Sequence, residues 1–402
     1  MFDQALYFTF TQTNVIKTER VIGLDFVRAT AILSVVFAHS LCFLSRLGNV
    51  PVVGEKITYL IDHILTLSVI GVELFFVLSG FLIGNILIRT FLKTDFSFAE
   101  VRQFWIRRWF RTLPNYWLIF TADILLYQAL RLNDFHARDL LGYVFLQNLW
   151  YPNLLEFFPE GWSLSVEEWF YLTLPVVVYV AARISAPRDK GNFLLKIFMG
   201  YLLVFVIARF VNAFHPINGD DPDDGIRKVV LFRLDAVMYG VLFAYLNHFK
   251  VEMLNRIKKH LFVVCLITVP VLSYFIRAYQ LAFLSSPYPA LRFASNAFLF
   301  LLLPVLLSLC LPFANSVKTV KSKRLSGAVQ HVSKISYSMY LVHYSLVFIP
   351  FFNVMKVSSQ GLVVVWYIGY WVIVVVLSSV IYKYFEYPVM QLRERTKNRK
   401  NQ

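Results

Sequence analysis

Long apolar stretches recur along the whole of this 402-residue chain, and they constrain its fold more than any other feature. Runs of about 18 or more mainly apolar residues are long enough to cross the hydrocarbon core of a bilayer as helices. Hydrophobic residues make up 58% of the chain and charged residues only 16%. A water-soluble surface needs far more charge than this. The sequence therefore predicts an all-α polytopic membrane protein.

The apolar stretches predict a bundle of about ten transmembrane helices. We expect the spans near residues 22–45, 67–88, 114–130, 163–182, 197–213, 228–247, 261–280, 291–312, 336–355 and 361–385. They form one membrane domain over residues 21–390, with a cytoplasmic N-terminal segment at 1–20 and a basic cytoplasmic tail at 391–402. Asp123 interrupts the third span and His343 lies in the ninth.

The basic residues predict how the bundle is oriented. With the N-terminus inside the cell, most of the 39 lysines and arginines fall in segments on the cytoplasmic side, as the positive-inside rule requires. Both termini are then cytoplasmic. Anionic lipid headgroups are natural counter-ions for the net charge of +15, so the charge implies no nucleic-acid partner. The acidic stretch DDPDD at 220–224 falls in an outer loop, where we expect it to be solvated, with a contact to a cation as the less favoured alternative.

Metal and targeting signals are weak. Cys42, Cys265 and Cys310 lie in apolar segments at wide spacing, which suggests neither a disulfide framework nor a zinc site, and we expect no metal. Residues 1–20 carry several charges and no uninterrupted apolar core, so the first span is expected to act as the insertion signal.

Arg28 and His39 bring two ionisable side chains into the first span. Their separation corresponds to about 16 Å along a helix and returns nearly to the same helix face. Charge in a lipid environment is costly, so this stripe should face the protein interior or a watery cavity. Arg28 alone is equally consistent with a packing role in a pair with Asp25. His39 has no local partner, and neutral imidazole is suited to act as a general base or nucleophile.

Further polar side chains lie in the outer part of the predicted membrane region. Glu73, in the second span, is expected at the depth of His39, where it either orients the imidazole or is an ordinary interfacial acid. Glu167 and Glu168 begin the fourth span and point about 100° apart, so at most one should face a central site. Arg233 and Asp235, on the sixth span, either pair to hold helices together or contact a substrate.

A second group lies toward the cytoplasmic side. In FWIRRWFRTLPNYW, residues 104–117, Arg108 and Arg111 share a helix face among aromatic side chains. Guanidinium groups bind phosphates in a bidentate manner, although composition alone favours an ordinary basic interfacial segment. His343, on the ninth span, is expected at the depth of Arg28, about 10 Å from the inner face.

Seven motifs in order resemble membrane acyltransferase family 3. They are the Arg28–His39 spacing, LFFVLSGFLI, Arg-x-x-Arg at 108–111, WSLSVEEWFY, FRLDAVMYG, SYSMYLVH and a closing FEYP. Each motif is weak by itself, but together they cover about residues 20–390. Some family members carry a fused SGNH-hydrolase domain, and this chain resembles the stand-alone form.

The resemblance implies transfer of an acyl group, usually acetyl, from cytoplasmic acyl-CoA to a hydroxyl of an extracytoplasmic glycan or glycolipid. It implies residence in a bacterial plasma (inner) membrane. By the resemblance, Arg28 and His39 are the essential arginine and histidine of the family, and Arg108 and Arg111 its paired arginines. We expect these three arginines and His343 to contact acyl-CoA.

The remaining site residues are assigned to catalysis or to the acceptor. We expect His39, Glu73 and Glu167 to carry catalysis. Trp162, Arg233 and Asp235 are expected to contact the carbohydrate acceptor.

Two other classes of protein fit parts of this pattern. A transporter or flippase for a glycan or lipid-linked precursor also places ionisable residues within the membrane. However, the sequence has no inverted repeat and no paired broken helices of the kind many transporters show. A non-catalytic membrane scaffold leaves the buried histidines and arginines without a role.

Overall fold

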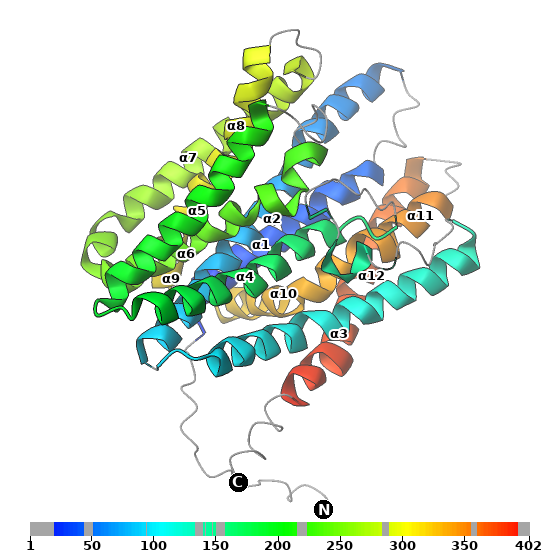
Figure 1. Cartoon of the computed structure of the whole chain (residues 1–402). Coiled ribbons are helices and arrows are strands. Elements are labelled where there is room, and N and C mark those ends of the chain that lie inside the picture. Colours follow the sequence, from blue (N-terminus) through cyan, green and yellow to red (C-terminus); the bar gives the residue numbers. More distant parts are fainter. Residues whose placement is uncertain are drawn as a thin grey trace, which may run out of the picture.

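The computed structural model of the chain describes residues 20–43, 51–93, 95–132, 140, 142–146, 148–149, 157–214, 223–283, 289–354 and 360–392. These residues are almost entirely helical and contain no strand. The long helices run side by side in one bundle (Figure 1). The predicted all-α class is confirmed.

Helices cover every predicted span. The α-helices are α1 (Ile22–Ser40), α2 (Pro51–Lys93), α3 (Phe98–Leu130), α4 (Gly161–Ser185), α5 (Lys190–Phe214), α6 (Leu234–Phe249), α7 (Val251–Phe283), α8 (Pro289–Ser308), α9 (Leu311–Ser316), α10 (Lys323–Leu341), α11 (Ile349–Val354) and α12 (Gln360–Ile381). Shorter segments are the π-helical η3 (Gly142–Leu146), η4 (Asp223–Arg227), η6 (Val342–Phe348) and η7 (Tyr382–Glu386), and the 3₁₀-helical η5 (Val230–Phe232).

Nine helices within the described residues are long and apolar enough to cross a membrane. The third predicted span, 114–130, is not among them, because Pro114, Asn115 and Asp123 dilute its apolar residues. It forms the second half of α3, which is about 50 Å long. Pro114 therefore lies inside this helix rather than at its start. The helix begins at a capping box in which Ser97 and Glu100 bond each other's backbone.

Helix α2 lies at the centre of the bundle and packs against α1, α6 and α8. Its closest approach is to α6, at two glycines. A Cβ atom on Gly80 would lie 1.8 Å from the carbonyl oxygen of Val237, and one on Gly240 would lie 2.0 Å from that of Val77. Only glycine permits backbones to approach this closely. The contact fixes α2 against α6 and so defines the space left for side chains on the other faces of α2.

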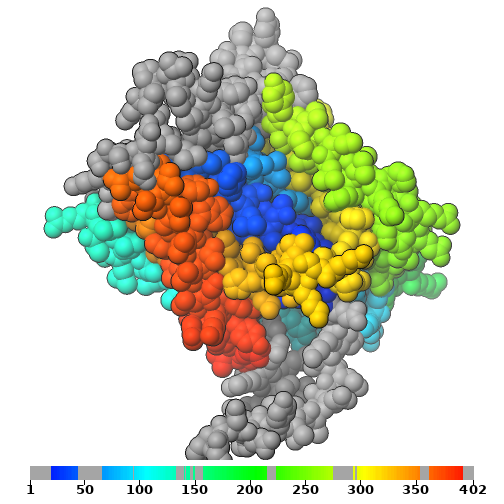
Figure 2. All heavy atoms as spheres, turned by 180° about the vertical axis from the view of Figure 1, so that it is seen from behind, coloured from blue at the N-terminus to red at the C-terminus, as the bar shows by residue number. Residues whose placement is uncertain are grey.

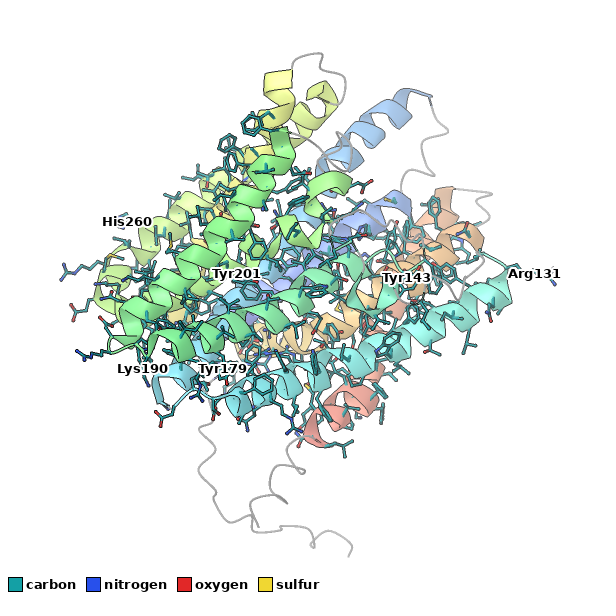
Figure 3. The ribbon with its side chains drawn as sticks, in the orientation of Figure 1. Arg131, Tyr143, Tyr179, Lys190, Tyr201 and His260 are labelled. Carbon is teal, nitrogen blue, oxygen red and sulfur yellow. The ribbon has the colours of Figure 1, made fainter. Side chains whose placement is uncertain are left out.

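Residues that the sequence places on the same side of the membrane lie at the same end of the bundle. Lys190 and His260, both expected on the cytoplasmic side, lie toward one end, whereas Arg131 at the end of α3 lies at the other (Figure 3). Which end faces the cytoplasm remains a prediction from the distribution of basic residues.

Helix α1 has two different faces. One is visible at the surface, between the C-terminal helices and the segments near residue 300 (Figure 2). Leu33 and Phe37 on this face are 39% and 36% exposed, as expected for side chains that meet lipid. The opposite face packs against α2 and α10 and carries the ionisable residues.

Candidate active site

Two neighbouring cavities lie inside the bundle, and α1 contributes an ionisable side chain to each. The first, here called the arginine cavity, has a volume of about 100 Å³ and is lined in part by Arg28, Arg108 and Arg111. The second, the histidine cavity, has a volume of about 350 Å³ and is lined in part by His39 and His343. The expectation that the stripe on α1 faces a cavity is confirmed.

Arg28 does not form the packing pair with Asp25 that the sequence left open. The Asp25 carboxylate accepts hydrogen bonds from Arg20, at 2.6 and 3.0 Å, and from the hydroxyl of Ser333 at 2.6 Å. Within the described part of the chain, Arg28 forms no ion pair. Its guanidinium is therefore available to a ligand in the arginine cavity.

Arg108 and Arg111 extend from neighbouring turns of α3 toward Arg28. Arg108 lies over the rings of Phe104 and Tyr171, with its guanidinium carbon 5.9 and 5.8 Å from the ring centroids. Neither arginine forms an ion pair among the described residues. Three guanidinium groups around one small cavity repel one another and attract an anion.

Glu167 lines the arginine cavity, whereas Glu168 does not. The Tyr171 hydroxyl donates to Glu167 at 3.0 Å and also bonds Ser79. Glu168 accepts from Thr112 at 2.7 Å. The expectation that only one of the two glutamates faces a central site is confirmed. Glu167, however, lies with the arginines rather than with His39. Within the described ranges, no group of three His, Cys, Asp or Glu side chains is arranged to hold a metal ion.

His39 and His343 form a direct contact in the histidine cavity. The His39 Nδ1 atom lies 3.1 Å from His343 Nε2, and the ring centroids are 5.1 Å apart. The ring of Tyr344 packs 4.8 Å from that of His39. His343 is the second residue of η6. Turns of π-helix often occur at functional sites.

The contacts of His343 determine which nitrogen of each neutral ring carries the proton. Its Nδ1 lies 2.7 Å from the carbonyl oxygen of Tyr340, which only accepts, so Nδ1 donates. The Nε2 atom of His343 is then an acceptor and receives the proton of His39 Nδ1. As a result, His39 Nε2 has a free lone pair. This is the form that a general base or nucleophile requires.

The predicted depth of His343 is wrong. The ninth span was expected to begin at residue 336, but α10 begins at Lys323. His343 therefore lies about 30 Å along its helix, comparable with the distance of about 26 Å between Ile22 and His39. His343 contacts His39 instead of lying near Arg28, and its expected contact with acyl-CoA stays a prediction.

We expect His343→Ala to lower kcat by about 10- to 100-fold with little change in the KM for the donor expected from the sequence, acyl-CoA. The substitution removes the acceptor that fixes the tautomer of His39, and orienting partners of this kind contribute rate rather than donor binding. Steady-state kinetics at several pH values measures both effects. His343→Gln, whose amide oxygen is an acceptor, should restore part of the rate. A raised KM with unchanged kcat would support the donor contact expected from the sequence.

The histidine cavity also has a polar part, lined by Asp223, Arg227 and Lys228, that the sequence reasoning did not place at the site, although it did name Trp162. Trp162 lines this cavity, and the Arg227 guanidinium lies over its ring, 4.7 Å from the centroid. Asp223 forms ion pairs with Arg227 and with Lys228, the latter at 2.9 Å. The i, i+4 spacing of acidic and basic residues in DDGIRK was the available signal.

Asp223 and Asp224 remain 30% and 31% exposed and form ion pairs, so both the solvated loop and the cation contact expected from the sequence are present; residues 220–222 lie outside the described residues. Lys228 donates to Asp224 at 2.6 Å. Burial acts to raise the pKa of the Asp223 carboxyl, but Arg227 and Lys228 outweigh it and hold this pKa below its usual range. Asp223 is therefore ionised at neutral pH and fixes Arg227 in the cavity wall.

Glu73, Arg233 and Asp235 line neither cavity, and their expected roles in catalysis and acceptor binding are not supported. Glu73 pairs with Arg233, and Arg209 pairs with Asp235; all four side chains are fully buried. Arg233 also donates to the carbonyl oxygen of Phe300 at 2.6 Å. The idea that Arg233 and Asp235 hold helices together is correct, but each uses a different partner.

Comparison with curated proteins gives several relatives. A Staphylococcus aureus (strain COL) protein named as a candidate O-acetyltransferase is 31% identical over 222 residues, covering 50% of this chain and 34% of that protein. Peptidoglycan O-acetyltransferase OatA of Listeria monocytogenes is 30% identical over 152 residues, covering 34% of this chain and 24% of that protein. O-acetyltransferase OatA of Staphylococcus aureus (strain NCTC 8325) is 26% identical over 190 residues, covering 42% of this chain and 30% of that protein. This chain thus matches about a third or less of the length of each relative. No solved structure matches it significantly.

The family comparison covers far more of the chain. Residues 21–383 match the model of the acyltransferase domain family, and this range includes both cavities. It contains helices α1 to α12 and every motif from Arg28 to His343. The chain therefore belongs to the acyltransferase domain family, membrane acyltransferase family 3.

Proposed function

We propose that the protein takes an acyl group from cytoplasmic acyl-CoA at the arginine cavity and transfers it, at the histidine cavity, to a hydroxyl of an extracytoplasmic glycan or glycolipid. One observation carries this proposal. Helix α1 places Arg28 in a cavity with two further arginines and His39 in the adjacent cavity, about 16 Å away along the helix.

The donor binds at the arginine cavity through its phosphates. Arg28, Arg108 and Arg111 form no ion pairs among the described residues, so a phosphate supplies the negative charge that they lack. Three unpaired cations around one cavity repel one another, which makes binding of an anion here favourable. The charged part of CoA stays at this end while the thioester extends toward His39.

His39 Nε2 carries the chemistry. It either removes the proton from the acceptor hydroxyl while the oxygen attacks the thioester carbonyl, or first takes the acyl group itself. In both routes the C–S bond breaks, a C–O bond forms in the product, and CoA leaves as a thiolate that takes up a proton. Arg227, in the wall of the same cavity, supplies positive charge for the tetrahedral oxyanion.

The acceptor is a carbohydrate. Trp162 and Tyr344 offer aromatic faces to the histidine cavity, and Asn148 with the charged wall offers hydrogen-bonding groups. The name of the Listeria relative specifies peptidoglycan, which supports a bacterial envelope glycan and a place in the plasma membrane. Family membership and O-acetyltransferase relatives favour acyl transfer over transport of a glycan.

A direct test uses inverted membrane vesicles that contain the full chain and envelope glycans. Acetyl-CoA labelled in the acetyl group is supplied at the cytoplasmic face. We expect label to enter the glycan fraction as an alkali-labile ester, with release of an equal amount of free CoA. Movement of a glycan across the membrane without CoA release would contradict the proposal and support a transporter.

We expect a double substitution Arg108→Gln and Arg111→Gln to raise the KM for acetyl-CoA by about 100-fold or more, because each charge-assisted hydrogen bond contributes roughly 1.5–3 kcal/mol. Arg102→Gln is the matched control, since Arg102 lies on the same helix but is exposed and lines neither cavity. Equal donor dependence of the double variant and the control would place the CoA phosphates elsewhere.

A further inference from the structure

Asn148 lines the histidine cavity with a polar side chain that is only 2% exposed, and its Oδ1 atom has no hydrogen-bond partner within the described residues. A carboxamide oxygen that is buried without a partner is costly. Other polar side chains of the cavity are already bonded, since Glu160 accepts from Ser345 and Asp223 pairs with Arg227. A group that enters the cavity can supply the partner that Asn148 lacks.

The backbone at Asn148 suits an asparagine and fixes its position. Its φ angle of 57° lies in the left-handed region, which asparagine tolerates better than most residues other than glycine. The carbonyl oxygen of Asn148 accepts from the N–H of Val230 at 2.8 Å, and that of Leu149 accepts from the N–H of Leu231 at 3.1 Å. The base of the side chain is therefore held in place. Its last torsion has a broad minimum, so the carboxamide can turn toward the cavity.

Asn148 and His39 line the same small space. The cavity has a volume of about 350 Å³, which is near the lower end for ligand sites. A hydroxyl that gives its proton to His39 Nε2 and a group that bonds Asn148 therefore belong to one small unit of the acceptor. In a carbohydrate this unit is a single sugar ring. Its hydroxyl groups can each donate to the Oδ1 atom of a carboxamide.

We propose that Asn148 selects the acceptor by binding a second hydroxyl of the sugar ring whose first hydroxyl reacts at His39. This inference rests on the proposed function. The second hydroxyl donates to Asn148 Oδ1 and so orients the ring with its reacting hydroxyl at His39 Nε2. A ring that lacks the second hydroxyl leaves Oδ1 buried and unpaired, and sites of this kind discriminate strongly against such analogues. The acceptor is therefore a ring with several free hydroxyl groups rather than an isolated alcohol.

The first test uses the unmodified full chain, purified in a detergent that contains no sugar. Acetyl-CoA is supplied with methyl glycosides of the common hexoses and N-acetylhexosamines, and NMR of the product identifies the acetylated position. Each monodeoxy analogue of the best glycoside is then compared with its parent. We expect the loss of one hydroxyl, other than the reacting one, to lower kcat/KM by about 10- to 100-fold. Equal use of all analogues that keep the reacting hydroxyl would overturn the inference and leave the proposed function intact.

The second test assigns this effect to Asn148. Asn148→Gly removes the carboxamide, and glycine adopts the left-handed φ without strain. We expect transfer to the best glycoside to fall by about 10- to 100-fold, and the deoxy analogue to be used as well as its parent. Hydrolysis of acetyl-CoA by water should fall much less, because water has no second hydroxyl to bind. Arg131→Gly is the matched control, since Arg131 also has a left-handed φ, of 53°, but is exposed and lines neither cavity.

The other outcomes are equally distinct. Continued discrimination against the deoxy analogue by Asn148→Gly would overturn the role of Asn148. An equal fall in transfer and hydrolysis, in protein that still binds acetyl-CoA, would also overturn it, because the carboxamide would then act on the thioester. Transfer to envelope glycans but to none of the glycosides would show that a single ring is not the unit recognised. Absence of transfer to glycosides and envelope glycans alike would contradict the proposed function, and the inference with it.

Discussion

His39→Ala is expected to lower acyl transfer by about 10²- to 10⁴-fold, the usual contribution of a general base, and to abolish it if an acyl-histidine intermediate forms. The substitution removes the nitrogen whose lone pair the contact with His343 leaves free. Donor binding, which we propose takes place at the arginine cavity, should survive, because Arg28 lies about 16 Å from His39 along α1. Transfer of labelled acetyl to glycan and equilibrium binding of acetyl-CoA measure the two properties separately.

The matched control for this variant is His260→Ala. His260 is exposed on α7 and lines neither cavity, so its loss should leave transfer and donor binding unchanged (Figure 3). Added imidazole should partly restore transfer by His39→Ala if the ring acts as a base. Transfer at the normal rate by correctly inserted His39→Ala protein would remove the assigned chemistry. Loss of acetyl-CoA binding together with transfer would instead indicate a structural role.

The fold was largely predictable because the membrane makes apolar length a reliable signal. Each of the ten expected spans corresponds to a helix in the structure, and the errors are in where helices begin. A hydropathy window detects only the apolar part of a helix. It therefore missed the polar first turns of α3 and α10, which begin at Phe98 and Lys323. The SxxE capping box at Ser97 was the local signal for the first of these.

The site was predictable where one helix fixes the geometry. Arg28 and His39 lie on the same helix, so their spacing alone predicted a shared stripe that reaches two levels of the bundle. Arg108 and Arg111 followed from the same reasoning on α3. Contacts between helices were not predictable, because they depend on how each helix is rotated and shifted against its neighbours. The prediction began this span at residue 336, whereas α10 begins at Lys323, and this error alone placed His343 at the wrong depth.

The same limit explains the charged residues in the core. Glu73, Arg233 and Asp235 were recognised as unusual in a membrane segment, but sequence alone cannot show which charges meet. Arg209 was overlooked, although it is fully buried and pairs with Asp235. An intramembrane charge is evidence for a partner before it is evidence for a function. Arg28 and His39 differ from these four residues because they line a cavity, and not because they lie at a different depth.

Glu73→Ala is expected to destabilise the protein by about 3–5 kcal/mol, because it leaves the Arg233 guanidinium buried without a counter-charge. Arg233 lies between α2 and α8, near the rings of Phe76 and Phe300, so neither water nor lipid headgroups can replace the carboxylate. Thermal unfolding of the purified protein in detergent measures the loss. Glu252→Ala is a suitable control, since this carboxylate is exposed at the start of α7.

A double variant distinguishes a structural ion pair from a catalytic carboxylate. Glu73→Ala combined with Arg233→Met removes both charges and should recover most of the stability lost in the single variant, because buried pairs are often replaceable by apolar side chains of similar volume. Acyl transfer should recover with it, since neither residue lines a cavity. A stable double variant that remains inactive would instead show that Glu73 acts on His39 through a contact absent from this conformation. Recovery of both properties would leave His343 as the orienting partner of His39.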